Sequence, residues 1–371
     1  MNKHIPHGPT GNRDKITRVS VVPILLPRAK PMKMAGGLIA NTPIVLVTLE
    51  TSAGVQGRSY VFSYVDSALR PLHAMIEEMA AMVVGTALQP LEIEKMLRGT
   101  YRFLGATGLI AIAIAAIDMA VWDAFARAAD LPLFRALGAQ GRPLRAYASF
   151  GMETPEATAE LAAQAAAAGY TGIKIKAGYP TLAEDLAVVR AARNALPNHV
   201  SLMLDYNQSL SLSEAEIRCA ALDNEGLSWI EEPILQEDHR GHAKLAAAMR
   251  TPIQLGENWF SSREMADAIE AGACDLAMPD LMKIGGVTGW LTASQIAATA
   301  AMPISSHLFH EVSAHVLCAT PGADWLEYLP LADPLLQEPL PVINGTVTPH
   351  PGPGTGLAWN EEAVKAYRAD R

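Results

Sequence analysis

The chain has 371 residues, of which 50% are hydrophobic and 18% are charged, a composition typical of a large folded core. The formal net charge is −9 and no long run of lysine and arginine occurs, so nucleic acid and anionic membranes are expected to be poor partners. Cys219, Cys274 and Cys318 are too widely spaced for a disulfide framework, and they favour a reducing, cytoplasmic location.

The first region runs from residue 16 to about residue 135, after a polar segment, 1–15, that we interpret as a flexible tail. Its predicted elements are strands at 19–26, 44–50 and 57–62, followed by a helical pattern from 65 to 128. Strands and helices segregated in this way predict an α+β unit. The segment 27–41 is interpreted as a loop. The apolar helix near Gly108 contains Asp118, so we expect a buried helix and no membrane span.

The second region, 136–336, alternates short apolar runs with alanine-rich helical segments. The runs lie at 146–151, 171–177, 201–207, 227–233, 252–258, 274–280, 303–307 and 325–329. This rhythm predicts successive βα units of a parallel barrel, whereas the competing doubly wound sheet lacks its glycine-rich fingerprint. The segment 337–371 is rich in proline and glycine, and we expect it to pack back on the first region.

Charged or ionisable residues lie at or near the carboxyl ends of seven of the eight predicted strands. They are Lys174, Lys176, Asp205, Glu231, Glu232, Glu257, Asp280, His307 and Glu327. The carboxyl ends of barrel strands face the active site. Burying so many charges costs several kcal/mol each unless they are paired or metal-bound, so the pattern favours a functional site over a set of solvated strand ends.

Asp205, Glu231 and Glu257 lie on three consecutive predicted strands. Three converging carboxylates repel one another unless a cation lies between them, and an all-oxygen ligand set favours Mg²⁺. Glu232 neighbours Glu231 and is expected to point away, in a supporting or structural role. Asn207 shares a strand face with Asp205 and is a candidate for holding a ligand or substrate oxygen.

Lys174 and Lys176 share one strand face, and their mutual repulsion is expected to lower one pKa toward the value that a general base needs. Asp280 precedes His307 by one strand, where a carboxylate orients an imidazole and raises its pKa. The strands of Lys176 and His307 lie on nearly opposite sides of an eight-stranded ring. That arrangement suits removal of a proton from one face of a carbon and its return to the other.

A carbon acid beside a carboxylate is very weak, so the developing charge must be stabilised. The metal ion and Lys174 are the expected sources of that stabilisation. Glu327, if apolar surroundings keep it protonated, is expected to donate a hydrogen bond to the same carboxylate.

The motifs GIKIKAGYP, LDYNQSL, WIEEP, LGENW, MPDLMKIGGVTGW, SSHLF and DWLE, with SAGVQGRSYVFSY before them, resemble the mandelate racemase subgroup of the enolase superfamily over residues 16–359. The resemblance implies a modified TIM (β/α) barrel with an α+β N-terminal capping domain. It implies one Mg²⁺ per subunit on the three carboxylates, and a homo-oligomer, often an octamer. It also implies residue roles: Lys176 and the His307–Asp280 pair as bases for opposite enantiomers, Lys174 and Glu327 at the substrate carboxylate, and Ser149 and Asn207 in assistance.

Lys283 is a second lysine to consider, because members resembling muconate-lactonising enzymes use a lysine on the sixth strand as second base. The Asp280–His307 pair is intact here, so we interpret Lys283 as structural or supporting.

Substrate specificity is expected to come from the lid segment 27–41 and from nearby apolar residues. The apolar candidates are Met32, Met34, Leu38, Ile39, Phe62, Tyr64 and Leu329. Arg28, Lys30 and Lys33 add positive charge to the same segment. Either they face solvent, or one of them, with Lys33 a candidate for a polar lid contact, meets a polar or anionic distal group of the substrate.

These features predict a Mg²⁺-dependent enzyme that binds a small carboxylate and removes the α-proton of a 2-hydroxycarboxylate through an enediolate. Two-base racemisation of mandelate or a related 2-hydroxy acid is the preferred reaction. The alternative is dehydration of a sugar acid to a 2-keto-3-deoxy acid, with His307 as general acid. A barrel that had lost catalysis would lack a ligand or a base, and none is missing.

Overall fold

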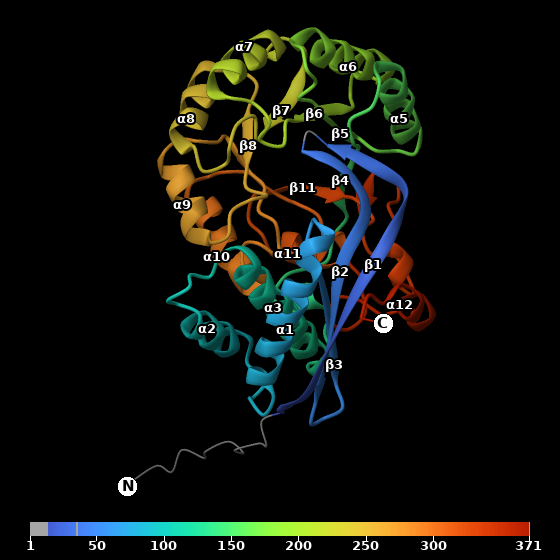
Figure 1. Cartoon of the computed structure of the whole chain (residues 1–371), viewed down its shortest axis with the longest axis vertical. Coiled ribbons are helices and arrows are strands. Elements are labelled where there is room, and N and C mark those ends of the chain that lie inside the picture. Colours follow the sequence, from blue (N-terminus) through green and yellow to red (C-terminus); the bar gives the residue numbers. More distant parts are fainter. Residues whose placement is uncertain (1–13, 35, 371) are drawn as a thin grey trace.

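The computed structural model describes residues 14–34 and 36–370. An N-terminal cap lies beside a barrel, with the cap in the lower part of Figure 1 and the barrel above it. The cap comprises β1 (Ile16–Met34), β2 (Gly37–Thr51), β3 (Gln56–Phe62), α1 (Asp66–Val83), α2 (Pro90–Thr100), α3 (Gly108–Ala128) and α4 (Leu133–Ala136). Most of the expected N-terminal tail lies outside the described residues. Asp14 and Lys15 are described and belong to the cap, because both bond to Ser52.

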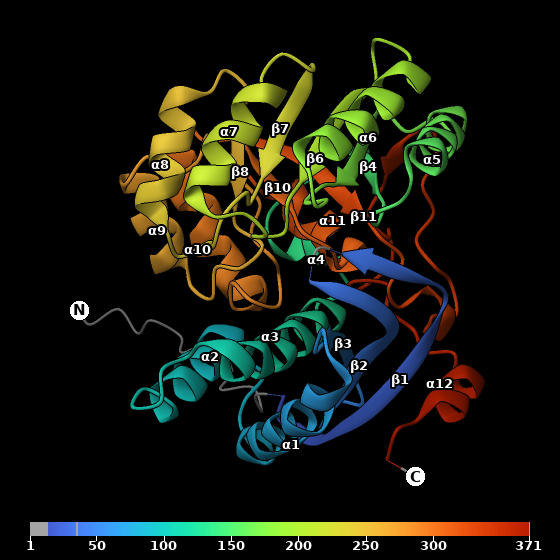
Figure 2. The ribbon, with the colours of Figure 1, turned by 45° about the horizontal axis from the view of Figure 1, so that its top comes forward.

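The segment 27–41 is not a loop, and that expectation was wrong. It forms the outer half of a long antiparallel hairpin, in which Pro27 pairs with Asn41 and Met32 with Ile39. The register shifts between Pro27 and Met32, where prolines cannot donate ladder hydrogen bonds. Figure 2 shows this hairpin reaching from the cap to the barrel.

The outer part of the hairpin approaches the barrel closely at the segment after β4. The amide of Met152, after β4, donates to the carbonyl of Lys33 at 2.7 Å. A Cβ built on Gly151 would lie 2.9 Å from that same carbonyl oxygen, so the approach needs a residue without a side chain. The cap hairpin therefore forms part of the roof over the strand ends.

Helix α3 is a core helix, and its buried residues are apolar apart from Asp118 and Asp123. It is long and apolar enough to cross a membrane by length and composition, but 83% of its most apolar window is buried inside the protein. It packs on β3 and α1. This matches the expectation of a buried helix.

The barrel alternates strands and helices as the sequence indicates. Its elements are β4 (Leu144–Ser149), α5 (Pro155–Ala167), β5 (Gly172–Lys176), α6 (Leu182–Ala195), β6 (Ser201–Asp205), α7 (Leu212–Leu222), β7 (Leu227–Glu231), α8 (His239–Ala248), β8 (Ile253–Leu255), α9 (Ser262–Glu270), β9 (Leu276–Ala277), α10 (Gly286–Thr299), β10 (Ile304–Ser306), α11 (His310–Cys318) and β11 (Ala323–Tyr328). The strands are parallel and run in order from β4 to β11, and β11 pairs with β4 to close the ring. The expected modified barrel with an α+β cap is confirmed.

The barrel interior is layered with the period of two that strands impose. One buried cluster contains Tyr147, Met203, Trp229, Met278 and Trp325. Two residues further along each strand lie Ser149, Asp205, Glu231, Asp280 and Glu327. An apolar layer thus fills the barrel beneath a polar layer at its mouth.

The last segment of the chain touches both domains. It contains η1 (Asp333–Leu335), β12 (Thr346–Val347) and α12 (Glu361–Tyr367), and β12 pairs antiparallel with β4. The buried carboxylate of Asp123, on α3, accepts from the amide of Thr355 at 2.6 Å and from its hydroxyl at 2.8 Å. Trp359 donates its indole N–H to Thr48 of β2 at 2.9 Å.

Candidate active site

Three carboxylates converge at the barrel mouth from β6, β7 and the end of β8. Asp205, Glu231 and Glu257 each offer an oxygen, and these oxygens all lie within 4.8 Å of one another. All three side chains are buried. Burial, and then the charge of Asp205, raise the pKa of Glu231 well above its usual value. A divalent cation would relieve that repulsion, and the all-oxygen set suits a hard ion such as Mg²⁺.

A glycine makes the placement of Glu257 possible. Gly256 has φ +138°, and a Cβ there would lie 2.8 Å from the backbone of Met278 and from the ring of Trp259. Only a residue without a side chain fits this position, so the backbone can turn Glu257 toward the two other carboxylates.

The two lysines of β5 are enclosed by these carboxylates. Lys174 Nζ lies 2.8 Å from Glu231 Oε1 and 3.0 Å from Glu327 Oε1, and Lys176 Nζ bonds to Asp205. Burial and the charge of Lys174 lower the pKa of Lys176, but the attraction of Asp205, Glu257 and Glu231 together outweighs them, and the net pKa is raised. The expectation that lysine–lysine repulsion lowers one of the two pKa values was therefore wrong, because the carboxylates around both lysines outweigh their mutual repulsion.

His307 is held by a buried carboxylate on the neighbouring strand. Its Nδ1 lies 2.5 Å from Asp280 Oδ2, and Asp280 Oδ1 accepts from the amides of Met282 and Lys283 at 2.8 and 3.1 Å. His307 Nε2 faces Glu257 Oε2 at 3.1 Å. Burial lowers the pKa of His307, but Glu257 and further carboxylates raise it to about 10 overall.

The surroundings of Glu327 are not the apolar ones that would keep it protonated, because Lys174 and His307 lie beside its carboxylate. Burial raises its pKa, but Lys174 and then His307 hold the net pKa below the usual range. The sequence placed Glu327 correctly at the end of a strand but gave no sign that a lysine would lie against it.

A cavity opens above this polar layer. Its lining includes Lys176, His307, Glu257, Glu327, Ser149 and Asn207 on the barrel side. On the cap side it includes Met32, Met34, Ile39, Pro43, Phe62 and Tyr64, with the polar Arg28, Asn41 and Thr42. Leu308, Leu329 and Leu331 add apolar lining from the barrel domain. The seven residues named for substrate contact from the sequence, Ser149, Asn207, Met32, Ile39, Phe62, Tyr64 and Leu329, thus all line the cavity. Lys174 is fully buried beneath it.

Of the three basic lid residues, only Arg28 lines the cavity. Lys33 is exposed and lies at a different hollow with Glu153 and Tyr179, which agrees with the alternative that it faces solvent. Lys30 pairs with Glu153 at 2.5 Å. Arg28 donates to the Thr42 hydroxyl at 3.2 Å, and its buried Nε has no hydrogen-bond partner among the described residues. Because the register of β1 shifts between Pro27 and Met32, a simple alternation of strand faces does not predict which of the three basic residues faces the cavity.

Non-glycine residues in left-handed backbone follow three of the strands that carry site residues. Asn207, Glu232 and Leu308 have φ of 44°, 36° and 53°. Such conformations cost of order 1–3 kcal/mol each and persist where surrounding structure holds them. Each one turns the chain sharply just after a side chain that faces the cavity or the carboxylates.

Glu232 and Lys283 support the site from outside the cavity. Glu232 accepts from Gln208 and Asn258 side chains at 2.9 and 2.6 Å, and burial with the nearby Glu257 raises its pKa to about 8. Lys283 donates to Asn258 at 2.6 Å and lies 4.4 Å from the centre of the Tyr64 ring. Neither residue lines the cavity, which agrees with the supporting roles expected for both.

Family models match both domains of this chain. The model described as "Enolase C-terminal domain-like" matches residues 157–363, and "Mandelate racemase / muconate lactonizing enzyme, N-terminal domain" matches residues 16–138. Among curated relatives, L-talarate/galactarate dehydratase of Salmonella typhimurium is 31% identical over 366 residues, covering 95% of this chain and 91% of the relative. L-Ala-D/L-Glu epimerase of Bacillus subtilis is 27% identical over 286 residues, covering 74% and 75%.

Solved structures agree with this assignment. An enolase from Bradyrhizobium, complexed with magnesium and mandelic acid, is 43% identical with a TM-score of 0.93, covering 97% of this chain and 99% of that chain. L-talarate dehydratase from a Polaromonas species, complexed with Mg and L-glucarate, is 31% identical with a TM-score of 0.89, covering 96% and 98%. Since both domain models, the barrel with its cap and the three-carboxylate site agree, the chain belongs to the mandelate racemase/muconate lactonizing enzyme family of the enolase superfamily.

Proposed function

We propose that this protein is a Mg²⁺-dependent enzyme that removes the α-proton of a 2-hydroxycarboxylate and returns a proton to the opposite face. The favoured substrate is mandelate or another 2-hydroxy acid with an apolar distal group. The observation that carries the proposal is the cavity itself, in which Lys176 and His307 face a wall that is mainly apolar. The likeness to a mandelate-bound relative supports the same substrate class.

The metal centre is assigned to Asp205, Glu231 and Glu257. When bound, the ion supplies positive charge beside the substrate carboxylate as the α-carbon loses its proton. Lys174 holds Glu231 and Glu327 in place through its two short contacts and adds a second positive charge beneath the cavity.

The two bases act from β5 and from the end of β10. Two strands, β4 and β11, lie between them on one side of the ring, and four strands lie between them on the other. In one direction, the free amine of Lys176 takes the α-proton and the imidazolium of His307 gives a proton to the other face. In the reverse direction their roles exchange. Asp280 fixes the ring of His307 through Nδ1, so that Nε2 points away from Asp280 toward the carboxylates at the cavity.

A second function, dehydration of a sugar acid, is favoured by Arg28. Its guanidinium borders the cavity, and its buried Nε has no hydrogen-bond partner among the residues described. A distal carboxylate or hydroxyl of an acid sugar would supply that partner. After α-proton removal, His307 would protonate a departing β-hydroxyl, and the products would be water and the enol of a 2-keto-3-deoxy acid.

Proton NMR in D₂O separates the two reactions. The protein, loaded with Mg²⁺, is incubated with (R)- and (S)-mandelate and, separately, with galactarate and glucarate. Racemisation predicts exchange of the mandelate α-proton for deuterium and appearance of the other enantiomer. Formation of a 2-keto-3-deoxy acid without mandelate exchange would replace the racemase proposal with the dehydratase. Absence of both reactions would contradict both substrate classes.

A further inference from the structure

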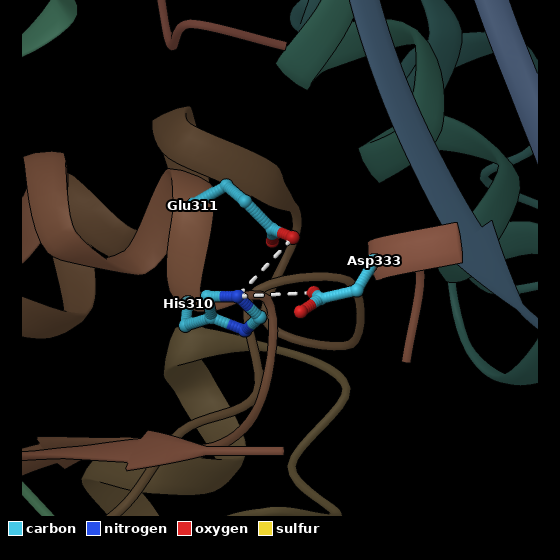
Figure 3. A group of neighbouring side chains, drawn as sticks. All are labelled: His310, Glu311 and Asp333. Carbon is cyan, nitrogen blue, oxygen red and sulfur yellow. Dashed lines mark ion pairs between the residues drawn. The ribbon is translucent and has the colours of Figure 1, made fainter. Parts of the chain in front are cut away.

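A second group of metal-ligating side chains lies outside the active site. It consists of His310 and Glu311, at the start of α11, and Asp333, at the start of η1 (Figure 3). His310 and Glu311 are buried and Asp333 is partly buried. Nothing in the mechanism above uses these residues, and the sequence analysis did not single them out.

The polar atoms of this group lack the hydrogen-bond partners that burial demands. Both ring nitrogens of His310, Glu311 Oε1 and Asp333 Oδ1 have no hydrogen-bond partner among the described residues. His310 is 0% exposed. Buried polar atoms are almost always paired, so several unpaired ones facing one point are suited to binding a ligand.

The spacing of the donor atoms fits one ion. His310 Nε2 lies 3.3 Å from Glu311 Oε1 and 3.6 Å from Asp333 Oδ1, and Figure 3 shows both carboxylates directed at this nitrogen. Ligands bound at 2.0–2.1 Å around a tetrahedral zinc ion are separated by about 3.3–3.4 Å. Neither carboxylate is aligned to accept a hydrogen bond from His310 Nε2, although both lie near it.

One of the three side chains is held in place by an outer hydrogen-bond partner, as metal ligands usually are. Tyr60 donates its hydroxyl to Glu311 Oε2 at 2.8 Å, which fixes the carboxylate and leaves Oε1 facing His310. Outer partners of this kind orient metal ligands. One neutral imidazole and two carboxylates together balance a divalent charge.

We propose that His310, Glu311 and Asp333 bind a divalent transition-metal ion, with zinc as the reference ion, at a structural site separate from the catalytic magnesium. One nitrogen and two oxygen ligands suit zinc better than magnesium, which prefers oxygen and retains its water. The ion would join the start of α11 to the segment that contains Asp333. His307 precedes α11, Leu331 precedes Asp333, and both His307 and Leu331 line the cavity. It would therefore stiffen one wall of the active site without touching the substrate.

The test uses the full-length protein, stripped with a chelator and then kept in excess Mg²⁺ so that the catalytic site is occupied. Zinc is added, its binding is measured by calorimetry, and its position is located by anomalous diffraction at the zinc edge. We expect one zinc ion per subunit with a peak at His310 Nε2. We also expect a higher midpoint of thermal unfolding, because the ion binds the folded state.

Variants identify the ligands. His310→Gln and Asp333→Asn should each weaken zinc binding by more than about a hundredfold, since even outer partners of metal ligands contribute 10- to 100-fold. His242→Gln is the matched control, because His242 is also fully buried with an unpartnered Nε2, on α8. It should bind zinc like the wild type. Circular dichroism reports folding, and the partly exposed Asp333 provides a variant that tests the site even if His310→Gln does not fold.

The proposal is overturned if zinc is found only at Asp205, Glu231 and Glu257. It is also overturned if no zinc binds in excess Mg²⁺, or if Asp333→Asn binds zinc as tightly as the wild type does. These results are independent of whether the protein racemises mandelate or dehydrates sugar acids.

Discussion

The barrel mouth and the cap hairpin differ in how they hold their side chains. At the mouth, Lys174 and His307 each contact two or more carboxylates, and the whole set is buried on strand ends. In the hairpin, apolar side chains such as Met32 and Ile39 line the cavity while the ladder of β1 and β2 has a shift in register. Barrel geometry therefore fixes the charged groups, whereas part of the apolar wall of the cavity comes from a ribbon with a less regular register.

The largest expected effects come from removing a base at the barrel mouth. Lys176→Ala should lower α-proton exchange from one enantiomer of mandelate by roughly 10²–10⁴-fold, and His307→Asn should do so for the other. The reason is that each base serves one face of the carbon. The rates are measured by proton NMR in D₂O for each enantiomer separately.

Lys283→Met is the control for this experiment. Lys283 is a buried lysine that contacts Asn258 and Tyr64 but does not line the cavity. Any loss it causes should be equal for the two enantiomers. Equal losses for Lys176→Ala and His307→Asn on both enantiomers would show that the bases do not act from opposite faces.

An intermediate effect on activity is expected at Arg28, the basic residue of the cap that lines the cavity. If the substrate is an acid sugar, Arg28→Met should lower kcat/KM for galactarate by roughly 10- to 100-fold, because a hydrogen bond to a charged group contributes about 1.5–3 kcal/mol. For mandelate, the same variant should keep or raise kcat/KM.

Lys30→Met is the matched control for Arg28→Met. Lys30 lies on the same strand, but it is exposed and pairs with Glu153 outside the cavity. It should change neither rate. A common decrease for both substrates in Arg28→Met would indicate that Arg28 supports the hairpin and does not select the substrate.

The smallest effect on activity is expected at the junction of cap and barrel. Asp118 of α3 accepts from Thr288 of α10 through the amide at 3.0 Å and the hydroxyl at 2.5 Å, yet burial raises its pKa from 3.8 to about 7. A raised pKa in the folded state gives stability that is complete below the unfolded value and is lost as the pH rises toward 7. Asp118→Asn cannot ionise, so it should gain stability relative to the wild type between about pH 4 and 7, by roughly 1–4 kcal/mol.

Urea unfolding at several pH values measures this difference. Above about pH 7 it should stay constant. Asp267→Asn, at a side chain that is 50% exposed and pairs with Arg263, is the control and should follow the wild type. A difference that does not change with pH would mean that Asp118 is ionised throughout.

Much of the barrel could be predicted from the sequence because strand periodicity is strict. Met203 and Asp205, or Trp229 and Glu231, are two residues apart and therefore share the barrel interior, with the apolar member below and the charged member above. The same rule placed Lys174 and Lys176 together. Short apolar runs with polar ends were sufficient to find every strand of the ring and the residues of its mouth.

What could not be predicted depends on contacts between distant segments. Prolines and lysines made the outer part of the β1–β2 hairpin look like a loop, because in a two-stranded ribbon such residues can face outward or occupy a register shift. The pKa directions of Lys176 and Glu327 depend on partners from other strands. The adjacent His310 and Glu311 were a visible signal, but Asp333 joins them only through the fold.

The bonds of Asp123 to Thr355 have a consequence for the order in which the protein matures. A ribosome makes the cap first and the C-terminal segment last. The buried carboxylate of Asp123 obtains these two partners only after almost all of the chain has been translated. The cap, which supplies part of the cavity lining, is thus begun first and completed last, and a nascent barrel would emerge before its cap is secured.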